Sequence, residues 1–520
     1  MIAPFNMIAP FNTALFTTPS PSPSPSGGSI ILTWDATDFA LLIAIIHAAI
    51  VFVAAVRISS TRPPSSAIAW VLAIAFMPFI GITWFLLIGA GRLPLHRRLK
   101  QGEVNRLALE RTENLDAVGH SDAWPPYLGT GVELTRRLGA LPMVGGNRWR
   151  LHPDYDSSFV AMAEDIDLAT EMVNVEFYIL VLDPVTQPVF DAMARAVQRG
   201  VRVRVMSDHV ASLRNANHKG TLKALKDMGA EYEAMLPLRP FKGQWQRPDL
   251  RNHRKLITID HRIGWMGSIN LVQSSYGLKK NIKRGLHWHD LMVRLEGPVV
   301  RELDVIFATD WFSETNELID LDTSPVVLPD DDDPDAPRDD MQVVPSGPSF
   351  ENDINLKLFV YLINSAQRRL SITSPYFVPD EATMMAIVTA ASRGVEVELF
   401  VSEIGDQFMV FHAQRSYYEE LLKAGVRIWL YKAPTVLHAK HFSIDDDVAV
   451  IGSSNMDIRS FALDMESSLL VHGKSFVDAL NKIDDDYRAN SSELLLSAWT
   501  SRSGMSKIAD SLMRMTSSLQ

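Results

Sequence analysis

The chain has 520 residues, of which 47% are hydrophobic, and a formal net charge of −11 at pH 7. This length predicts two to four domains. The chain contains no cysteine, which excludes disulfides, thiolate nucleophiles and cysteine-ligated zinc. An acidic chain lacks the overall basic face that nonspecific nucleic-acid binding needs, so no nucleic-acid partner is expected.

Residues 1–38 are predicted to form a low-complexity N-terminal tail. The tail begins with Met-Ile-Ala-Pro-Phe-Asn twice and continues into a Pro-Ser repeat over residues 17–26, which is typical of an extended segment. No Lys or Arg precedes Arg57, so the tail lacks the positively charged start of a signal peptide.

Two uncharged apolar runs follow, at residues 39–56 and 67–90. Each is close to the ~20 residues that cross a bilayer, so residues 39–90 predict a two-helix transmembrane hairpin with a bend at Pro78. The alternative is a helical pair buried in a soluble core, which the apolar residues on every face disfavour. His47 lies inside the first run, and we expect a neutral imidazole bonded to a neighbour rather than a functional group.

Residues 91–135 are predicted to form a basic juxtamembrane connector. Six Lys and Arg residues lie between residues 92 and 111, whereas the loop between the two apolar runs has only Arg57 and Arg62. The positive-inside rule therefore predicts that the rest of the chain is cytoplasmic.

Two globular halves are predicted, at residues 136–321 and 346–500. In each half an apolar strand-like run precedes a helix, a second strand and a second helix, and a glycine closes each helix. The glycines are Gly200 and Gly229 in the first half, and Gly394 and Gly425 in the second. This order predicts an α/β fold of two sandwich domains related by pseudo-twofold symmetry, with an active site at their interface.

The halves are joined by a predicted acidic linker at residues 322–345. Its Asp330–Asp335 stretch lacks the glycine and glutamate of an EF-hand, which favours a solvated linker over a calcium site. Residues 501–520 are a predicted C-terminal tail. Their pattern fits a weak membrane contact, a surface helix or a frayed end, and its residues are Met505, Lys507, Ile508, Leu512, Arg514 and Met515.

One motif occurs in both halves with identical spacing. Its copies are His253, Lys255, Asp260, Gly267, Ser268 and Asn270, and His438, Lys440, Asp445, Gly452, Ser453 and Asn455. Six identities at about 5% usage each would recur by chance about once in tens of millions of positions, so the motif is a duplicated functional element. The alternating apolar context predicts a strand with His and Lys on one face.

Two such copies brought together would enclose a small volume with imidazole, ammonium, amide and hydroxyl groups. Lysines and amides neutralise and orient phosphoryl oxygens. One histidine can attack phosphorus while the other protonates the leaving oxygen, because the imidazole pKa lies near neutrality. No metal and no cofactor are expected, since the lysines repel a divalent cation and no H-E-x-x-H spacing occurs.

These residues resemble the signature of the phospholipase D superfamily, H-x-K-x4-D-x6-G-[GS]-x-N. Within it the chain is most similar to bacterial cardiolipin synthases, over roughly residues 39–500. The supporting segments are residues 374–380, 415–422 and 452–460, with Trp288-His-Asp290. The chain departs from the family in having Gly-Ser where Gly-Gly is common in the first motif, and Asp464 where Asn is frequent.

The resemblance implies a phosphatidyltransferase that joins two phosphatidylglycerol molecules into cardiolipin and releases glycerol through a phosphohistidine. It implies catalytic roles for His253, Lys255, Asp260, His438, Lys440 and Asp445, phosphate binding by Ser268, Asn270, Ser453 and Asn455, and orientation of the histidines by Glu466 and Asp290. The expected partners are the bilayer and phosphatidylglycerol, and the expected location is the bacterial cell membrane, with several crossings and cytoplasmic catalytic domains. Oligomeric state is left open.

Several alternatives remain open at this point. Asp260 and Asp445 fit a structural contact as well as a catalytic role. Tyr376 fits a pocket-lining or a core position, and His287 and His289 fit a head-group contact or simple packing. A phospholipase D hydrolase or nuclease is the alternative enzyme. A noncatalytic membrane scaffold is disfavoured because both motifs are complete.

Overall fold

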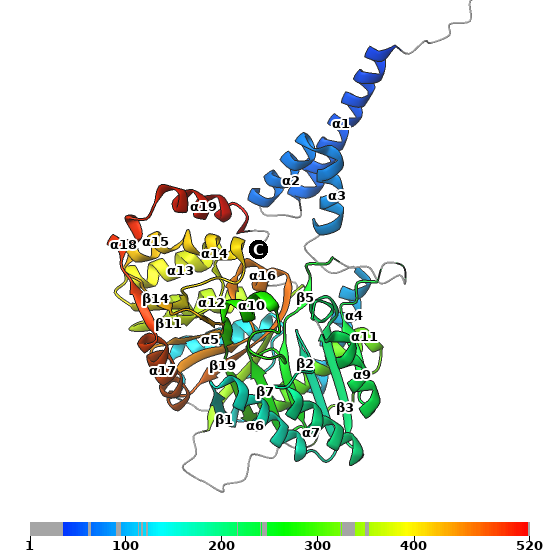
Figure 1. The fold of residues 1–520 in the computed structure, drawn as a ribbon, viewed down its shortest axis with the longest axis vertical. Coiled ribbons are helices and arrows are strands. Elements are labelled where there is room, and N and C mark those ends of the chain that lie inside the picture. The colour runs from blue at the N-terminus through cyan, green and yellow to red at the C-terminus, as the bar shows by residue number, and fades with distance from the viewer. Residues whose placement is uncertain are drawn as a thin grey trace, which may run out of the picture. The chain divides into compact units, whose positions relative to one another are not determined.

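The computed structural model describes most of the chain, in two compact units at Met1–Ile82 and Thr83–Gln520 (Figure 1). The described residues are 35–60, 64–89, 95–112, 114–115, 118–120, 123–215, 217–239, 241, 247–322, 324, 338–348 and 353–517. The predicted low-complexity tail lies outside them, except for residues 35–38, and so does most of the predicted acidic linker.

The first unit is built from apolar helices. Helix α1 (Ala36–Ser59) begins at Asp35, whose side chain accepts hydrogen bonds from the backbone N–H groups of Thr37 and Asp38. With 24 residues and a mean hydropathy of 2.9, α1 is the one helix among the described residues that is long and apolar enough to cross a membrane. His47 Nε2 lies 3.0 Å from the Ala75 carbonyl oxygen, which is the neighbour contact expected for this histidine.

The predicted second span is two helices rather than one bent helix. Helix α2 (Pro64–Phe76) has 13 residues, and α3 (Pro78–Ile88) has 11, so each alone is shorter than the ~20 residues of a bilayer crossing. Pro78 has no backbone N–H and its ring clashes with the preceding turn, which ends α2, while proline at a first helical position favours the start of α3.

The second unit contains one long sheet. Among the described residues it has sixteen strands, in the order β20-β14-β13-β11-β16-β17-β19-β10-β1-β9-β7-β6-β2-β3-β4, with β5 (Arg251–Asn252) pairing beside β19. The first-half strands are β1 (Val144–His152), β2 (Met172–Phe177), β3 (Arg202–Asp208), β4 (Glu231–Met235), β6 (Lys255–Ile259), β7 (Ile263–Gly267) and β9 (Met292–Glu296). The second-half strands are β10 (Asp339–Ser346), β11 (Arg369–Thr373), β13 (Glu396–Ser402), β14 (Arg427–Tyr431), β16 (His441–Ile444), β17 (Val448–Gly452), β19 (Asp464–His472) and β20 (Ser491–Leu494).

The strand order shows that the two halves are repeats. Strands β1 and β10 pair antiparallel in the middle, with Val144 opposite Met341. Outward from β1 the order is β9-β7-β6-β2-β3-β4, and outward from β10 it is β19-β17-β16-β11-β13-β14. The same chain positions therefore occupy the same places on either side of the centre, which is the predicted pseudo-twofold arrangement of two α/β halves.

The boundaries of the predicted linker and tail differ from the structure. Strand β10 begins at Asp339 and lies at the centre of the sheet, although residues 322–345 read as linker because their Asp residues dominate the local composition. Helix α4 (Leu95–Arg111) packs against α11 (Val299–Thr315) through an Arg97–Glu314 ion pair of 2.8 Å. The end of the predicted connector and the predicted C-terminal tail likewise form helices, α5 (Pro126–Arg137) and α19 (Gly504–Arg514).

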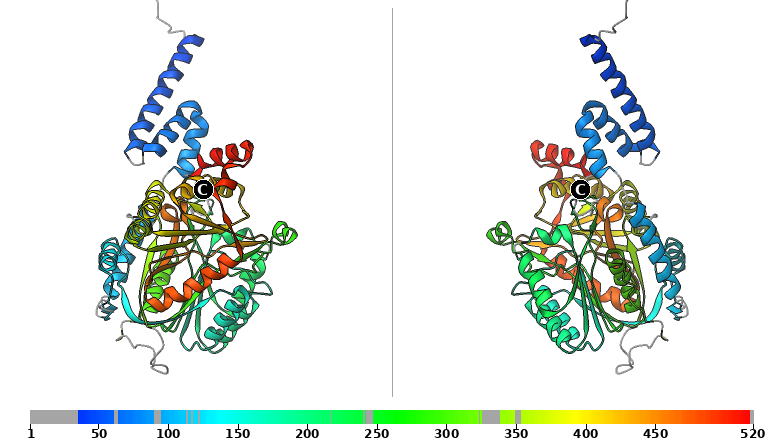
Figure 2. Two further views of the ribbon diagram at one scale, coloured as in Figure 1. Left: turned by 90° about the vertical axis from the view of Figure 1, so that its left-hand side faces the viewer. Right: turned by 90° about the vertical axis from the view of Figure 1, so that its right-hand side faces the viewer.

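Helices cover both faces of the sheet (Figures 1 and 2). Successive residues of β6 enter different cores: Leu256 packs in one cluster and Ile257 in another, as the alternation of a strand requires. One face of each half carries two helices, α6 (Tyr155–Asp167) with α7 (Gln187–Gln198), and α12 (Ile354–Ser365) with α13 (Glu381–Ser392). The other face carries α11 (Val299–Thr315) and α17 (Lys474–Ala489), which share one core across the centre.

The remaining elements are short connections around this sandwich. Helices α9 (His218–Met228) and α15 (Tyr418–Ala424) end at Gly229 and Gly425, whose φ angles of 88° and 95° favour glycine. The others are α8 (His209–Leu213), α10 (Lys279–Arg284), α14 (Phe408–Arg415), α16 (Ile458–Ala462), α18 (Leu496–Thr500), β8 (His287–His289), β12 (Phe377–Val378), β15 (Thr435–Leu437) and β18 (Met456–Asp457).

Candidate active site

Both copies of the motif sit at the start of a sheet strand. His253 lies two residues before β6 begins at Lys255, and His438 three residues before β16 begins at His441. The strand predicted for H-x-K therefore begins later than expected. Both histidines lie before it, and in the second copy so does Lys440. Lys255 Nζ and Lys440 Nζ each donate a hydrogen bond to the backbone carbonyl of the histidine two residues earlier, so each lysine stays beside its own histidine.

Short parallel strand pairs bring the two halves together at the histidines. Strand β5, just before His253, pairs with the start of β19, and β15, just before His438, pairs with β8. The His253 backbone N–H donates to the Met465 carbonyl at 2.8 Å, and that of His438 donates to the His289 carbonyl at 2.7 Å. Each histidine is thus tied to the residue that precedes a carboxylate of the opposite half.

The carboxylates are exchanged between the halves, meaning that each histidine pairs with a carboxylate of the opposite half. His253 Nδ1 lies 3.0 and 3.1 Å from the two carboxylate oxygens of Glu466. His438 Nδ1 lies 2.6 Å from Asp290 Oδ1. A carboxylate on Nδ1 fixes the tautomer and ring orientation and leaves Nε2 available for chemistry.

The two histidines differ in their electrostatic surroundings. Burial, reinforced by the charges of Lys255 and Lys440, lowers the pKa of His253 well below 6.5. Burial also lowers the pKa of His438, but Asp290 opposes it. The pKa of Asp290 is lowered: burial raises it, but His438 and Lys440 outweigh burial. Burial raises the pKa of Glu466 to about 7. These surroundings lower the pKa of both histidines, that of His253 well below its usual value, and the Asp290 carboxylate opposes the lowering at His438.

The two lysines are desolvated ammonium groups. Both are buried, and burial lowers the pKa of Lys255 to about 7 and that of Lys440 to about 8. A buried ammonium is stabilised by an anion in contact with it. A phosphoryl group between the histidines would supply such an anion, so these lysines fit the binding of a substrate phosphate.

The serines and asparagines after the second strand of each motif contact neighbouring side chains. The Ser453 hydroxyl donates to Glu466, and Ser268 contributes to the lowered pKa of Asp290. Asn270 Nδ2 donates to the Tyr276 hydroxyl at 2.8 Å. Asn455 Nδ2 donates to the Ser460 hydroxyl at 3.2 Å, and its buried Oδ1 has no partner among the described residues. The serines therefore contact the orienting carboxylates, and phosphate binding by Ser268 and Ser453 stays a prediction.

Comparison with known proteins identifies the family of this chain. The family model described as "Cardiolipin synthase, PLD-like domain" matches residues 162–311 and 359–486, more than half of the chain. The chain belongs to the cardiolipin synthase family of phospholipase D-like proteins. A second model, "Phospholipase_D-nuclease N-terminal", matches residues 49–89.

Relatives match over most of their length. Cardiolipin synthase A of Proteus mirabilis is 32% identical over 87% of this chain and 92% of its own. Cardiolipin synthase of Halalkalibacterium halodurans is 31% identical over 86% of this chain and 87% of its own. The crystal structure of phosphatidylserine synthase from Haemophilus influenzae shares the fold, with a TM-score of 0.53 and 15% identity over 74% of this chain and 97% of that one.

In this member of the cardiolipin synthase family the motif aspartates lie away from the histidines. Asp260 accepts hydrogen bonds from the backbone N–H groups of Thr170, Glu171 and Met172. Asp445 does the same for residues 367–369. At about 3.3 Å per extended residue, the seven residues from His253 to Asp260 span on the order of 20 Å. The structure does not bring these aspartates to the histidines, and their contacts favour the structural alternative over the catalytic one.

Two tyrosines flank the histidines. The Tyr178 ring lies edge-on to His253 at 4.8 Å between ring centres, and the Tyr376 ring lies edge-on to His438 at 6.2 Å. Sequence reasoning named Tyr376 but missed Tyr178. A signal was available, because Tyr178 directly follows β2 and Tyr376 follows the equivalent strand β11.

Other polar groups near the motifs pack elsewhere. His287 pairs with the Thr435 hydroxyl at 2.8 Å, and the His289 ring stacks on Tyr431 at 6.0 Å, so both match the packing alternative. Arg459 Nε donates to Asp464 at 2.9 Å. Burial, together with Glu466 and Asp457, raises the pKa of Asp464 to about 8. Arg459 also helps to lower the pKa of His253, a link that sequence reasoning did not find.

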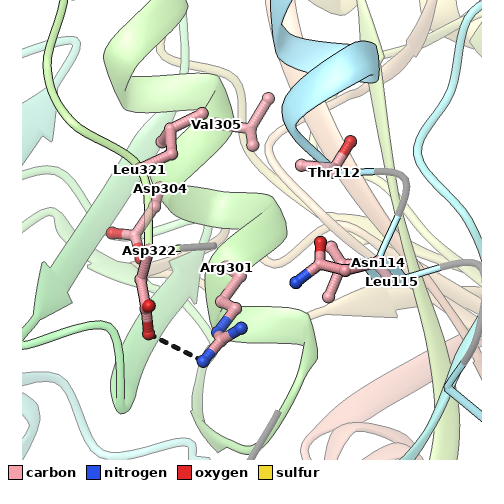
Figure 3. Close-up of a pocket in the computed structure, with 8 residues that line it drawn as sticks. All are labelled: Thr112, Asn114, Leu115, Arg301, Asp304, Val305, Leu321 and Asp322. Carbon is pink, nitrogen blue, oxygen red and sulfur yellow. Dashed lines mark hydrogen bonds and ion pairs between the residues drawn. The ribbon is translucent and has the colours of Figure 1, made fainter. Parts of the chain in front are cut away.

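A small hollow lies apart from these groups (Figure 3). It is lined by Thr112, Asn114, Leu115, Arg301, Asp304, Val305, Leu321 and Asp322, none of which belongs to the motifs. An Arg301–Asp322 ion pair of 2.7 Å lies beside it. The hollow therefore has no part in the candidate active site.

Proposed function

We propose that this member of the cardiolipin synthase family transfers a phosphatidyl group from one phosphatidylglycerol molecule to another, giving cardiolipin and glycerol. The observation that carries the proposal is the exchanged pairing of His253 with Glu466 and His438 with Asp290, beside two buried lysines. This set supplies a nucleophile, an acid/base and two cations for phosphate without a further group.

In the first half-reaction His253 is the nucleophile. Its Nε2 attacks the phosphorus of the first phosphatidylglycerol, a phosphorus–nitrogen bond forms, and the bond to the glycerol oxygen breaks. His438 gives its Nε2 proton to that oxygen. The lowered pKa of His253 supports this assignment because it keeps the attacking nitrogen unprotonated. Burial also lowers the pKa of His438, but Asp290 opposes that effect, which makes His438 the better proton donor of the two.

In the second half-reaction His438 acts as the base instead of the acid. His438 takes the proton from a hydroxyl of the second phosphatidylglycerol, whose oxygen attacks phosphorus, and the phosphorus–nitrogen bond breaks. Cardiolipin leaves, His253 is neutral again, and His438 holds a proton for the next cycle. Lys255 and Lys440 neutralise the nonbridging oxygens in both steps, with Asn270 and Asn455 as hydrogen-bond donors to phosphate.

The proposal includes a membrane location with more than one crossing. Helix α1 supports one crossing by its length and composition. Helices α2 and α3 together would make the second, since membrane helices tolerate a proline break where neighbours satisfy the backbone. The basic residues after α3 favour catalytic halves in the cytoplasm.

A product assay tests the reaction itself. Purified full-length protein in phosphatidylglycerol vesicles, with the label in the terminal glycerol, is expected to release glycerol and form cardiolipin in equal amounts. Phosphatidic acid as the sole product at high lipid density would establish the hydrolase alternative. Activity that requires a different donor lipid would retain the transferase and overturn the donor.

A labelling experiment tests the histidine roles. With a p-nitrophenyl phosphatidyl ester, whose leaving group needs no acid, His438→Ala is expected to retain a covalent adduct on His253, whereas His253→Ala forms none. His261→Ala is the matched control, because His261 also pairs with a carboxylate, Asp304, at 2.7 Å but lies outside the site. Mass spectrometry locates the adduct, and an adduct on His438 would reverse the assignment.

A further inference from the structure

Helix α19 is amphipathic, but it is packed with its polar side inward. Its acidic residue Asp510 is 2% exposed, whereas the apolar side chains of the opposite stripe are 53–79% exposed; they are Met505, Ile508, Leu512 and Met515. A surface helix of a soluble domain normally buries its apolar stripe against the core. An outward apolar stripe indicates an apolar partner outside the domain.

A charged cluster fixes this orientation. Asp510 accepts hydrogen bonds from Arg502 at 2.8 Å and from Arg415 of α14 at 3.4 Å, and its Oδ1 lies 2.7 Å from His412 Nδ1. The Ser503 hydroxyl caps the start of the helix. Turning α19 to bury its stripe would expose or unpair this cluster, and an uncompensated buried charge is costly. The helix is thus held with its apolar stripe outward rather than frayed.

The apolar surface continues onto the neighbouring helix. Helix α14 packs against α19, and its residues Phe408 and Met409 are 68% and 43% exposed. The Phe408 ring lies 4.4 Å from the His412 ring of the charged cluster. We call the six exposed side chains of α14 and α19 the α19 patch: Phe408, Met409, Met505, Ile508, Leu512 and Met515.

The charges on α19 indicate which apolar partner fits. Asp510 is buried, so the charges that remain at the surface of α19 are both positive: Arg514 is exposed, and Lys507 is half-buried with its Nζ donating to the Thr500 carbonyl at 2.7 Å. Arg514 lies 3.8 Å from Glu420 at its flank. An apolar stripe flanked by cations is the pattern of helices that lie in the interface of an anionic bilayer.

The α19 patch lies at one end of the second unit. In Figures 1 and 2 α19 and α14 are at the end opposite α6 and α7. Strand β5, which precedes His253 in the chain, also lies toward the end of the unit away from α6 and α7 (Figure 1). A surface against α19 would therefore lie at the end of the unit that holds β5.

We propose that the α19 patch docks the second unit on an anionic lipid surface, with the stripe of α19 at the boundary between headgroups and acyl chains. This contact does not depend on which lipid is the substrate. Such helices insert about 5–10 Å into the interface.

The natural absence of cysteine permits a direct test. Full-length Ile508→Cys carries an environment-sensitive fluorophore in vesicles of phosphatidylcholine with phosphatidylglycerol. Spin-labelled lipids with the nitroxide near the headgroup are expected to quench it strongly. Leu168→Cys is the matched control, because Leu168 is 65% exposed next to the end of α6 and is expected to stay unquenched.

Each outcome decides the proposal. A fluorophore at position 508 that lipid does not quench overturns it. A blue shift of the fluorescence that grows with protein concentration, without quenching by lipid, would show that a second copy of the chain binds the patch instead. As a further check, Ile508→Asp with Leu512→Asp is expected to reduce quenching at Met515→Cys on the order of tenfold. Equal quenching in vesicles of phosphatidylcholine alone would overturn the requirement for anionic lipid.

Discussion

The exchange of carboxylates makes Glu466→Gln the most informative substitution. Glutamine keeps the volume and one carbonyl acceptor for His253 Nδ1 and for the Ser453 hydroxyl, which now both contact Glu466. It removes the negative charge opposite an imidazole that becomes positive when it bonds to phosphorus. The substitution therefore isolates charge stabilisation in the first half-reaction.

The expected magnitude follows from the distances. The carboxylate oxygens lie 3.0 and 3.1 Å from Nδ1, which puts the charge centres about 4 Å apart. At an effective dielectric constant of about 20 the interaction is worth about 4 kcal/mol. Since about 1.4 kcal/mol corresponds to a factor of ten in rate, Glu466→Gln should slow formation of the phosphohistidine about 10³-fold.

The pH dependence has a definite sign. Burial raises the pKa of the Glu466 carboxyl to about 7, so the carboxyl gains its charge as the pH rises through this value. The ratio of the wild-type rate to the Glu466→Gln rate should therefore increase from pH 6 to pH 8. A ratio is used because the lysines titrate in both proteins.

The assay is the burst of p-nitrophenol from a p-nitrophenyl phosphatidyl ester in a stopped-flow instrument. Glu398→Gln is the matched control, because Glu398 is also buried but pairs with Arg488 at 2.7 Å. This control should retain the wild-type burst rate per folded molecule. A burst rate of Glu466→Gln within threefold of wild type, with the protein folded, would refute the reasoning.

Four further predictions concern the lysines, a motif aspartate, metals and topology. Because the pKa values of Lys255 and Lys440 are lowered to about 7 and about 8, kcat/KM should fall as the pH rises through this range and the ammonium charges are lost; a flat profile up to pH 9 would contradict this. Asp260→Asn should cost about 1–3 kcal/mol in denaturant unfolding and leave the burst rate per folded molecule within threefold, whereas loss of the burst would restore the catalytic alternative. Its lowered pKa, where backbone amides outweigh burial, places this stabilisation above pH ~4, and it is lost as the pH falls further. Activity should survive exhaustive EDTA treatment; loss that one divalent cation restores would contradict a histidine-only mechanism. With single cysteines at exposed Ser59 and Ser392, the proposed orientation predicts that an impermeant thiol reagent on intact cells labels position 59 but not position 392. Labelling at 392 but not at 59 would reverse the orientation.

The motif and the repeated helices could be predicted because their signals are local. The spacing from His253 to Asn270 is the same as that from His438 to Asn455, and a glycine with positive φ ends a helix wherever the chain must turn sharply. The second apolar run shows where such signals fail. Its composition is continuous, so nothing but Pro78 marks the point at which the structure separates α2 from α3.

The pairing of histidines with carboxylates could not be predicted, because it depends on contacts between distant segments. His253 and Glu466 are 213 residues apart, and the parallel register of β5 on β19 brings them together. The two carboxylates also lie at different distances from their motifs, since α10 and β8 separate Asn270 from Asp290, whereas the short α16 separates Asn455 from Glu466. The sequence names both carboxylates as orienting groups but does not say which histidine each one serves.

The exchange of carboxylates also bears on how such a chain can originate. If the two repeats were identical and unlinked, two copies meeting about a twofold axis would each give a histidine to the other's carboxylate and form two equal pairs. A single repeat alone would have a histidine without its orienting group, so selection for activity would act on the dimer. Joining the copies in one chain removes the requirement for identity, and the present pairs, one with glutamate and one with aspartate, are a divergence that a dimer of identical chains does not permit.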